Sequence, residues 1–382
     1  MHRKKKILLL VPNLTVGGAE RFMSLLANSL DKSKFEVHLG AINGANRFFA
    51  IDEAVHYYDL ATVRVRHAVW RIRNLIKKVE PEVVLCTQPE LNLVMGMFRF
   101  LFPGNFKLIA RESTILKSLL IHSPNLKLPT FLNSLYKWFL PNIDTVVCQS
   151  EDMRASLLEM GVRHPNILVI NNPVDVEAAL EKGKVVYPEA FDIVTVGRLS
   201  YEKGYDNLIK LVHLYQEKYK RTIRIAIIGE GAERPMLEKH IEELGLEQNI
   251  FLLGWQKNPF QFYKKAKFFL MTSHYEGFPN VLTEAGCVGL PSVAFDAPGG
   301  IKEIIQNGKN GFMVEVGNME LMVDTIHKAL HFPFDRIAIA EDTKNRFGLA
   351  TIIHQYETLI LKHTVNHKRA KRLSTSAVTV ES

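Results

Sequence analysis

Short aliphatic runs alternate with helix-length amphipathic stretches along the chain, and this alternation constrains the fold more than any other feature. Short apolar runs bounded by turn residues are typical of strands that are buried on both faces, and helical periods between them indicate crossover helices. The pattern therefore predicts an α/β protein built from parallel βαβ units. It occurs twice, once on each side of the turn-rich segment at residues 171–175.

Each repeat of the pattern predicts one open parallel sheet. In the first half, strands are predicted at residues 6–11, 36–41, 83–86, 107–110, 145–149 and 167–170. In the second half, they are predicted at residues 192–196, 224–228, 250–253, 268–272 and 291–294. Ligands of such sheets bind beyond the carboxyl ends of the strands, so two facing sheets would enclose a cleft there.

The expected organisation is two Rossmann-like domains and a C-terminal extension. The N-terminal domain covers residues 1–172 and the C-terminal domain covers residues 173–348. Residues 171–175 act as the hinge, because turn-rich segments make few long-range contacts. A closing helix is expected at residues 349–362, and residues 363–382 are expected to be a disordered basic tail because they have little to bury.

The composition of the 382 residues, 47% of them hydrophobic, fits folded domains and excludes collagen or a disordered chain. The three cysteines lie far apart and lack a Cys-x-x-Cys spacing, so neither a disulfide framework nor a structural zinc site is supported. The apolar run at residues 7–11 ends at Pro12 and is too short for a signal peptide. No run approaches the roughly 20 apolar residues that span a bilayer. These features predict a cytoplasmic protein.

Positive charge is concentrated in the first half, where residues 1–184 contain 24 basic and 17 acidic residues. Two segments, residues 64–73 and 133–140, mix cations with aromatic residues that include Trp70 and Trp138. Such surfaces suit anionic headgroups or phosphorylated ligands, although a solvated helix face with its aromatic residues packed inward would show the same pattern. No nucleic-acid recognition motif accompanies the charge, so no nucleic-acid partner is expected.

Two glycine-containing turns are candidate anion-binding loops. Gly17 and Gly18 lie between the first strand and a helix, where the backbone can approach a ligand and helical N–H groups can face an anion, or where they only form a tight turn. Arg198 and Lys203 lie five residues apart in a loop after a predicted strand. A fork-shaped guanidinium and a point charge in one loop can converge on a diphosphate.

The segment at residues 273–286 is the most specific. Glu276 falls on a loop and Glu284 in the helix that follows, so one carboxylate can reach the reacting end of a ligand while the other accepts hydrogen bonds from vicinal hydroxyls. The backbone N–H groups of residues 278–281 face the ligand between them. Gly229 and Gly231 form another turn after a strand, but a third glycine is missing, so they do not indicate NAD.

In its motifs the chain resembles the family 4 glycosyltransferases, retaining enzymes of the two-domain GT-B fold. The matching motifs are Gly-Gly-Ala-Glu, Gly-Arg-Leu-x-x-Glu-Lys-Gly, Gly-x-Gly, Glu-Gly-Phe-Pro-Asn-x-Leu-x-Glu-Ala and Pro-Gly-Gly-x-x-Glu. They occur in the family's order over about residues 1–362, closely in the second half and loosely in the first.

The resemblance implies roles for the motif residues. Arg198 and Lys203 would bind the donor diphosphate and offset the leaving-group charge, and Glu276 would lie near the anomeric carbon as the third catalytic residue. Glu284 would bind the ribose hydroxyls. The expected donor-binding residues are Gly17, Gly18, Arg198, Lys203, Gly229, Gly231, Phe278, Pro279, Asn280, Val281 and Glu284. No Asp-x-Asp motif occurs, and neither a metal nor a cofactor is expected.

Many relatives carry a histidine after the fourth strand where this chain has Arg111 and Glu112. Together with Glu20, these two residues are expected to line the acceptor cleft. His274 beside Glu276 is expected to be a packed loop histidine rather than a base.

The resemblance implies transfer of a hexose or N-acetylhexosamine from a UDP-sugar, with retention and without metal. The acceptor would be a hydroxyl of a lipid-linked glycan or polysaccharide in bacterial O-antigen, capsule or exopolysaccharide synthesis, at the inner face of the cytoplasmic membrane. A UDP-N-acetylglucosamine 2-epimerase and an inactive GT-B scaffold protein are alternatives. Conversion of the donor without an acceptor would identify the first, and failure to bind any nucleotide sugar would identify the second.

Overall fold

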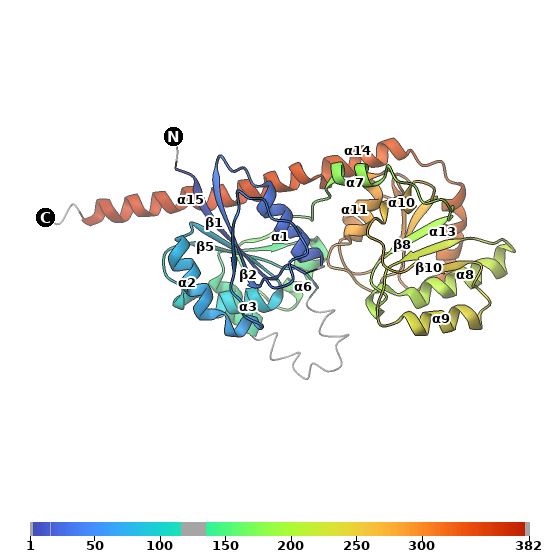
Figure 1. Ribbon diagram of the computed structural model, residues 1–382, viewed down its shortest axis with the longest axis horizontal. Coiled ribbons are helices and arrows are strands. Elements are labelled where there is room, and N and C mark those ends of the chain that lie inside the picture. The colour runs from blue at the N-terminus through green and yellow to red at the C-terminus, as the bar shows by residue number, and fades with distance from the viewer. Residues whose placement is uncertain (1–2, 16, 116–134, 379–382) are drawn as a thin grey trace. The chain divides into compact units, whose positions relative to one another are not determined.

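The computed structural model describes residues 3–15, 17–115 and 135–378. The chain divides into two compact units (Figure 1). The first unit comprises residues 1–172 together with residues 352–382, and the second comprises residues 173–351. Each unit is a parallel sheet flanked by helices, which confirms the α/β prediction of two Rossmann-like folds.

The sheet of the first unit has the strand order β3-β2-β1-β4-β5-β6-β7 among the described residues. Its strands are β1 (Lys5–Asn13), β2 (Phe35–Asn43), β3 (His56–Asp59), β4 (Val83–Thr87), β5 (Lys107–Arg111), β6 (Thr145–Cys148) and β7 (Ile167–Val169). Its helices are α1 (Gly18–Ser29), α2 (Val69–Val79), α3 (Pro89–Met97), α6 (Glu151–Glu159) and most of α15 (Leu349–Val378), with the 3₁₀ turns η1 (Val65–His67), η2 (Arg99–Leu101) and η3 (Leu140–Asn142).

The second sheet has the order β10-β9-β8-β11-β12-β13 among the described residues. Its strands are β8 (Ile193–Val196), β9 (Ile225–Ile228), β10 (Ile250–Leu252), β11 (Phe268–Met271), β12 (Ser292–Phe295) and β13 (Gly311–Val314). Its helices are α7 (Val176–Lys182), α8 (Tyr205–Tyr219), α9 (Arg234–Glu243), α10 (Phe260–Tyr263), α11 (Asn280–Cys287), α12 (Ile301–Ile304), α13 (Met319–His331) and α14 (Arg336–Phe347), with the 3₁₀ turn η4 (Tyr201–Lys203).

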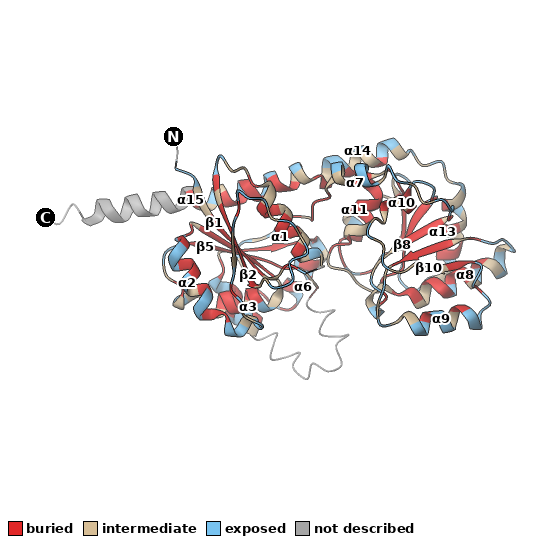
Figure 2. Cartoon of the chain, viewed as in Figure 1, coloured by how far each residue is buried: buried red, intermediate tan, exposed pale blue. Residues whose placement is uncertain are grey.

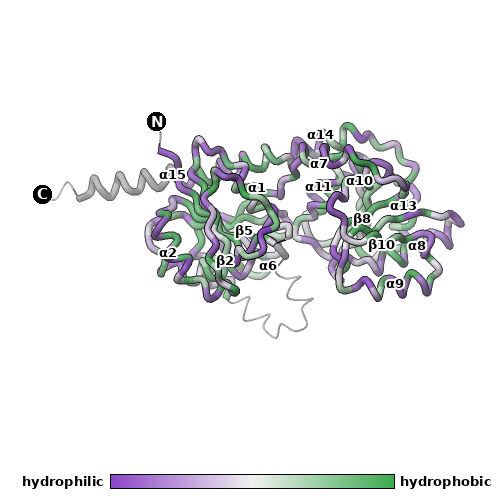
Figure 3. Tube along the Cα trace, in the orientation of Figure 1, coloured by the Kyte–Doolittle hydropathy of each residue, from purple (hydrophilic) through white to green (hydrophobic). Residues whose placement is uncertain are grey.

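Both sheets are covered on their two faces, which explains why their strands are continuous apolar runs rather than alternating ones. Residues 7–11 of β1 are all fully buried, as are residues 83–86 of β4 (Figure 2). The helices carry their apolar residues on one side. In α2, for example, Ile72, Leu75, Ile76 and Val79 are buried at helical spacing. Figure 3 shows the resulting hydrophobic strands inside each unit and more hydrophilic helices outside.

Two strands were absent from the sequence prediction. β3 is a four-residue strand at the edge of the first sheet, with two exposed residues and no fully buried one, so its sequence lacks the apolar run of a central strand. β13 begins at Gly311, directly after the residues Asn307-Gly308-Lys309-Asn310, whose composition is typical of a turn. A Cβ on Gly311 would lie 1.9 Å from the Ser292 carbonyl oxygen, so this glycine permits close strand pairing.

Helix α15 differs from the prediction in its length. The sequence analysis ended the helix at residue 362 and expected a disordered tail from residue 363, whereas α15 continues to Val378. The tail contains no Gly or Pro up to that residue and includes Lys, Arg and Ala, which favour helix.

The earlier part of α15 packs against the first unit. The Tyr356 ring lies 5.1 Å from the Phe22 ring, and a Glu357 carboxylate oxygen accepts a hydrogen bond from the Asp31 N–H at 2.8 Å. None of the described helices combines the length and the apolar character that crossing a membrane requires.

Candidate active site

Four loops of the second unit meet at one edge of its sheet. In the strand order, β9, β8, β11 and β12 are neighbours, and all are parallel, so the loops that follow them leave from the same edge. The chain order reverses between β8 and β11, because β9 continues the sheet on one side of β8 and β12 on the other side of β11. Such a switch point is where open α/β sheets bind ligands. The sequence-predicted residues from 198 to 284 all lie on these loops or on α11, which follows one of them.

Lys203 and Glu276 form an ion pair at the switch point. Lys203 Nζ lies 2.7 Å from Glu276 Oε1, and the Ser273 hydroxyl donates to the same oxygen at 2.8 Å. Both side chains are largely buried, with 22% of Lys203 and 11% of Glu276 exposed. The structure therefore brings together a cation and a carboxylate that are 73 residues apart in the sequence.

The two loops that carry this pair are fixed to each other by their backbones. The His274 N–H donates to the Glu202 carbonyl at 2.9 Å, and the Thr272 hydroxyl donates to the Lys203 carbonyl at 3.3 Å. Gly204 ends η4 at a φ of 60°, and a Cβ there would lie 2.2 Å from the Thr272 carbonyl oxygen. A side chain at residue 204 would separate the loops, so the glycine determines where Lys203 lies.

Arg198 is exposed and makes no side-chain ion pair or hydrogen bond with any residue that the structure describes. The backbone of the Arg198 loop packs closely against the loop that follows β9. A Cβ on Gly229 would lie 1.9 Å from the Gly197 carbonyl oxygen, and one on Gly231 would lie 2.2 Å from the Leu199 carbonyl oxygen. Gly229 and Gly231, predicted to bind the donor, thus allow close packing beneath the Arg198 loop.

The segment after Glu276 is anchored to the loop that follows β12. The Glu276 N–H donates to the Pro298 carbonyl at 2.8 Å. The Phe278 ring is buried against Gly300 and lies 5.8 Å from the Phe347 ring, and Pro279 is also buried. The side chains of Phe278 and Pro279 therefore serve packing, and they place the start of α11 at the switch point.

Glu284 lies one turn inside α11 and is 7% exposed. It shares a helix face with Asn280, four residues earlier, which is partly exposed together with Val281. His274 stacks on Tyr201 with ring centroids 4.7 Å apart, and its Nε2 lies 3.6 Å from an Asp206 carboxylate oxygen. These contacts agree with the expected packing role of His274.

In the first unit the chain order reverses between β1 and β4, and the predicted residues follow β1 and lie at the end of the nearby strand β5. Gly17 precedes α1, and a Cβ on it would lie 2.2 Å from Glu20 Oε2, so a side chain there would displace the Glu20 carboxylate. Gly18 is the first residue of α1. Glu20 is 8% exposed and accepts a hydrogen bond from Gln88 Nε2 at 2.6 Å. Gln88, which the sequence analysis did not identify, has a φ of 74°, uncommon outside glycine, directly after β4.

Arg111 is fully buried within the first unit. Its guanidinium donates to Thr87 Oγ1 at 3.2 Å and to Asn172 Oδ1, and it lies 3.8 Å from the Phe22 ring centroid. The prediction that Arg111 and Glu112 line an acceptor cleft stays a prediction, since neither side chain is exposed at a surface of the unit.

Glu112 follows Arg111 at the end of β5 and is 1% exposed. Its Oε1 accepts a hydrogen bond from Asn92 Nδ2 at 2.9 Å, while its buried Oε2 has no hydrogen-bond partner among the described residues. Burial raises the pKa of the Glu112 carboxyl to about 7. About half of the Glu112 carboxyls are therefore protonated at pH 7. Its partner Asn92 lies on α3 and carried no recognisable motif in the sequence.

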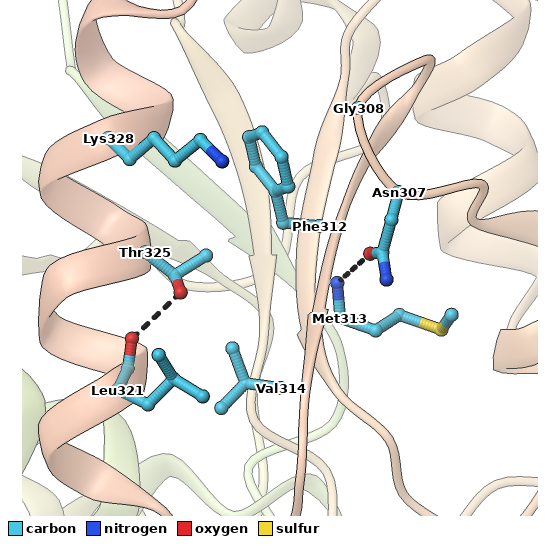
Figure 4. A pocket seen from close by; sticks show the side chains of 8 residues that line it. All are labelled: Asn307, Gly308, Phe312, Met313, Val314, Leu321, Thr325 and Lys328. Carbon is cyan, nitrogen blue, oxygen red and sulfur yellow. Dashed lines mark hydrogen bonds between the residues drawn. The ribbon is translucent and has the colours of Figure 1, made fainter.

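A separate pocket of about 390 Å³ lies between β13 and α13 in the second unit (Figure 4). Phe312, Val314 and Leu321 make it apolar, and Lys328 Nζ lies 4.4 Å from the Phe312 ring centroid. None of the sequence-predicted residues lines it. It is distinct from the four loops at the switch point.

Comparison with known proteins gives the family. The family described as Glycosyltransferase Family 4 matches residues 16–178, and the family described as Glycosyl transferases group 1 matches residues 178–346. The chain belongs to the family 4-type glycosyltransferases. The two matched ranges together span most of this glycosyltransferase and meet close to the boundary between its two units.

Curated relatives extend over nearly the full chain. The N-acetylgalactosamine-N,N'-diacetylbacillosaminyl-diphospho-undecaprenol 4-alpha-N-acetylgalactosaminyltransferase of Campylobacter jejuni is 26% identical over 361 residues, 90% of this chain and 94% of that protein. The lipopolysaccharide core biosynthesis glycosyltransferase LpsD of Rhizobium meliloti is 26% identical over 357 residues, with the same coverage of 90% and 94%. Relatives of this glycosyltransferase thus include enzymes of bacterial surface-polysaccharide assembly.

Solved structures confirm the GT-B fold. The lipopolysaccharide outer core galactosyltransferase WaaB in its apo form has a TM-score of 0.72 at 21% identity, covering 94% of this chain and 99% of that one. Anabaena HepE, solved in complex with UDP, has a TM-score of 0.72 at 20% identity, covering 94% of this chain and 100% of that one.

Proposed function

We propose that this glycosyltransferase moves a hexose or N-acetylhexosamine from a UDP-sugar to a hydroxyl of a lipid-linked glycan or polysaccharide, with retention of configuration and without a metal ion. The observation that carries the proposal is the Lys203–Glu276 pair, held between interlocked loops at the switch point of the second sheet with Arg198 exposed in the same loop. A uridine donor is supported by HepE, whose structure was solved with UDP.

In the proposed reaction the donor diphosphate lies against Arg198 and Lys203. Their positive charges offset the negative charge that develops on the departing UDP, which is the work that a metal ion does in other transferases. The sequence lacks the Asp-x-Asp motif, in agreement with this assignment. Without a donor, Lys203 is paired with Glu276, so diphosphate binding shares or releases that contact.

Glu276 is proposed to lie beside the sugar ring, near the anomeric carbon, and Glu284 to accept hydrogen bonds from the ribose hydroxyls. Retention follows if the acceptor hydroxyl attacks the face that UDP leaves. The bond from the anomeric carbon to the phosphate oxygen breaks, the bond to the acceptor oxygen forms, and the departing phosphate oxygen takes the acceptor proton.

The acceptor assignment is supported by the relatives and by a surface of the first unit. The name of the Campylobacter jejuni relative includes a diphospho-undecaprenol acceptor. Trp70 on α2 and Phe100 on η2 are 63% and 81% exposed, and we call these two residues the aromatic patch. The Arg73 guanidinium joins the two elements by donating to the Leu101 carbonyl at 3.0 Å. Exposed aromatic residues among cations suit the interface of an anionic membrane. We propose that the enzyme works at the cytoplasmic face of such a membrane.

The direct test is incubation of the purified enzyme with a panel of UDP- and GDP-sugars in EDTA, with detection of nucleoside diphosphate. We expect release of UDP from one UDP-sugar, and faster release when a lipid-linked glycan is added. Conversion of the donor to an epimer without an acceptor, or failure to bind any nucleotide sugar, would contradict the proposal.

A further inference from the structure

Three potential metal ligands meet on one face of the first sheet, apart from the loops already described. β2 and β3 are parallel neighbours in which His38 pairs in register with His56. Glu36 precedes His38 by two residues, so its side chain lies on the same face. One carboxylate oxygen of Glu36 and one ring nitrogen of each histidine all lie within 4.8 Å of one another. Among the described residues, this is the one His, Cys, Asp and Glu cluster of its kind.

His38 is held in a setting suited to a metal ligand. It is 5% exposed, with Nε2 3.0 Å from Glu36 Oε1 and Nδ1 3.2 Å from the Tyr58 hydroxyl. The Tyr58 hydroxyl can accept or donate, so Nδ1 is satisfied whether or not it carries the proton.

His56 provides the third ligand at the surface. Its ring stacks on that of His38 with centroids 4.7 Å apart, and it makes no hydrogen bond or ion pair within the described part of the chain. Lys6 Nζ lies 4.0 Å from Glu36 Oε1, but it also donates to the Val79 carbonyl at 3.2 Å, so it keeps a partner when Glu36 turns to a metal. Lys78 lies 5.0 Å from the Tyr58 ring centroid.

We propose that Glu36, His38 and His56 bind one divalent transition-metal ion, best matched by Zn²⁺. Two imidazole nitrogens and one carboxylate oxygen form a ligand set that Zn²⁺ accepts, with water in the fourth position. At Zn–ligand bonds of about 2.1 Å, ligand atoms lie roughly 3.4 Å apart, so the three atoms, which lie within 4.8 Å of one another, must move closer when the ion binds, and the exposed His56 ring is the one free to turn. The metal replaces the proton between His38 Nε2 and Glu36, and His38 Nδ1–H then donates to Tyr58, the outer partner that metal-bound histidines usually have.

The proposed metal has a structural consequence. β3 is an edge strand of four residues, joined to the sheet through β2 alone. A metal with ligands on both strands would link β3 to β2, and because it binds the folded unit it would raise the unfolding temperature. The sequence analysis did not identify this cluster, because His56 lies too far along the chain from Glu36 and His38 to form a recognisable ligand spacing.

Untagged full-length protein should be titrated with Co²⁺, followed by visible absorption, and with Zn²⁺, followed by calorimetry and thermal unfolding. The variants are His56→Ala and Glu36→Gln, both at partly or fully exposed positions, and the control is His354→Ala, an exposed histidine of α15. We expect one equivalent of metal in the wild type and the control. Each site variant should bind at least 10-fold more weakly and lose the rise in unfolding temperature with Zn²⁺.

The absence of metal uptake by the wild type would overturn the proposal. So would uptake that either site variant retains unchanged, or uptake that His354→Ala also abolishes. Because transfer activity is not the readout, failure here and failure of the proposed transferase function are distinguishable.

Discussion

At the scale of single residues, the second unit uses a carboxylate and a cation whose positions depend on each other. Glu276 Oε1 receives both Lys203 Nζ and the Ser273 hydroxyl, while Arg198 remains exposed. The first unit uses charge differently. Arg111 contacts the Phe22 ring, Thr87 and Asn172, whereas the second carboxylate oxygen of the buried Glu112 has no hydrogen-bond partner among the residues that the structure describes.

Glu112 should make stability depend on pH. Its pKa is about 7 in the folded state and near 4.5 in the unfolded chain, so the folded state holds its proton more tightly. The contribution of Glu112 to the free energy of unfolding is fully present below pH 4.5. As the pH rises from 4.5 to 7, the free energy of unfolding falls by about 3 kcal/mol in total. In Glu112→Gln that loss should disappear, because the amide resembles the protonated acid.

Urea denaturation of the wild type and Glu112→Gln between pH 4.5 and 8 measures this difference. The gap between the two curves should grow in favour of the variant up to about pH 7 and then stay constant. Glu53→Gln, at an exposed loop position, should run parallel to the wild type. A constant gap for Glu112→Gln would contradict the assignment.

At the scale of secondary-structure elements, glycines set how closely the loops approach. Gly204 and Gly245 form a matched pair, with φ of 60° and 63°. A Cβ on Gly204 would meet the Thr272 carbonyl oxygen at 2.2 Å, whereas one on Gly245 would meet nothing within 4 Å.

Gly245→Ala should therefore cost only the left-handed backbone strain, about 1 kcal/mol. Gly204→Ala should cost about 2 kcal/mol more, because the β8 and β11 loops must separate. It should also raise the KM for the donor, since Lys203 moves with its loop. Chemical denaturation and donor kinetics of both variants check this, and equal effects would show that the loops are not interlocked.

The elements also show what the sequence can predict. The central strands were found because burial on both faces gives apolar runs, as in β1 and β4. β3 was missed because none of its residues is fully buried, so it has no apolar run. β13 was missed because it is short and begins at Gly311, next to the turn-forming residues 307–310. The site loops were found because their charged and glycine residues are close in sequence. The partners Ser273, Gln88 and Asn92 are ordinary polar residues whose roles arise only when distant strands align.

At the scale of the whole molecule, we propose that the first unit carries the membrane-binding surface. The aromatic patch of the first unit should bind anionic vesicles, and Trp70→Ser together with Phe100→Ser should weaken that binding by about 10-fold. Trp255→Ser in the second unit, at a residue 58% exposed, should leave binding unchanged. Co-sedimentation with phosphatidylglycerol and phosphatidylcholine vesicles measures both. Equal loss of vesicle binding in the patch variant and in Trp255→Ser would show that exposed aromatic residues bind vesicles non-specifically, without a defined patch.

The central claim is that the switch point of the second sheet binds and activates the donor. Kinetics of UDP release by Lys203→Ala and Glu284→Ala test it most directly, with Lys239→Ala on the outer helix α9 as control. Lys203→Ala should lower kcat by about 100-fold or more, because the Lys203 ammonium group is proposed to stabilise the leaving group. Glu284→Ala should weaken donor binding by about 10-fold or more, and Lys239→Ala should match the wild type. Wild-type kinetics in both site variants would contradict the account.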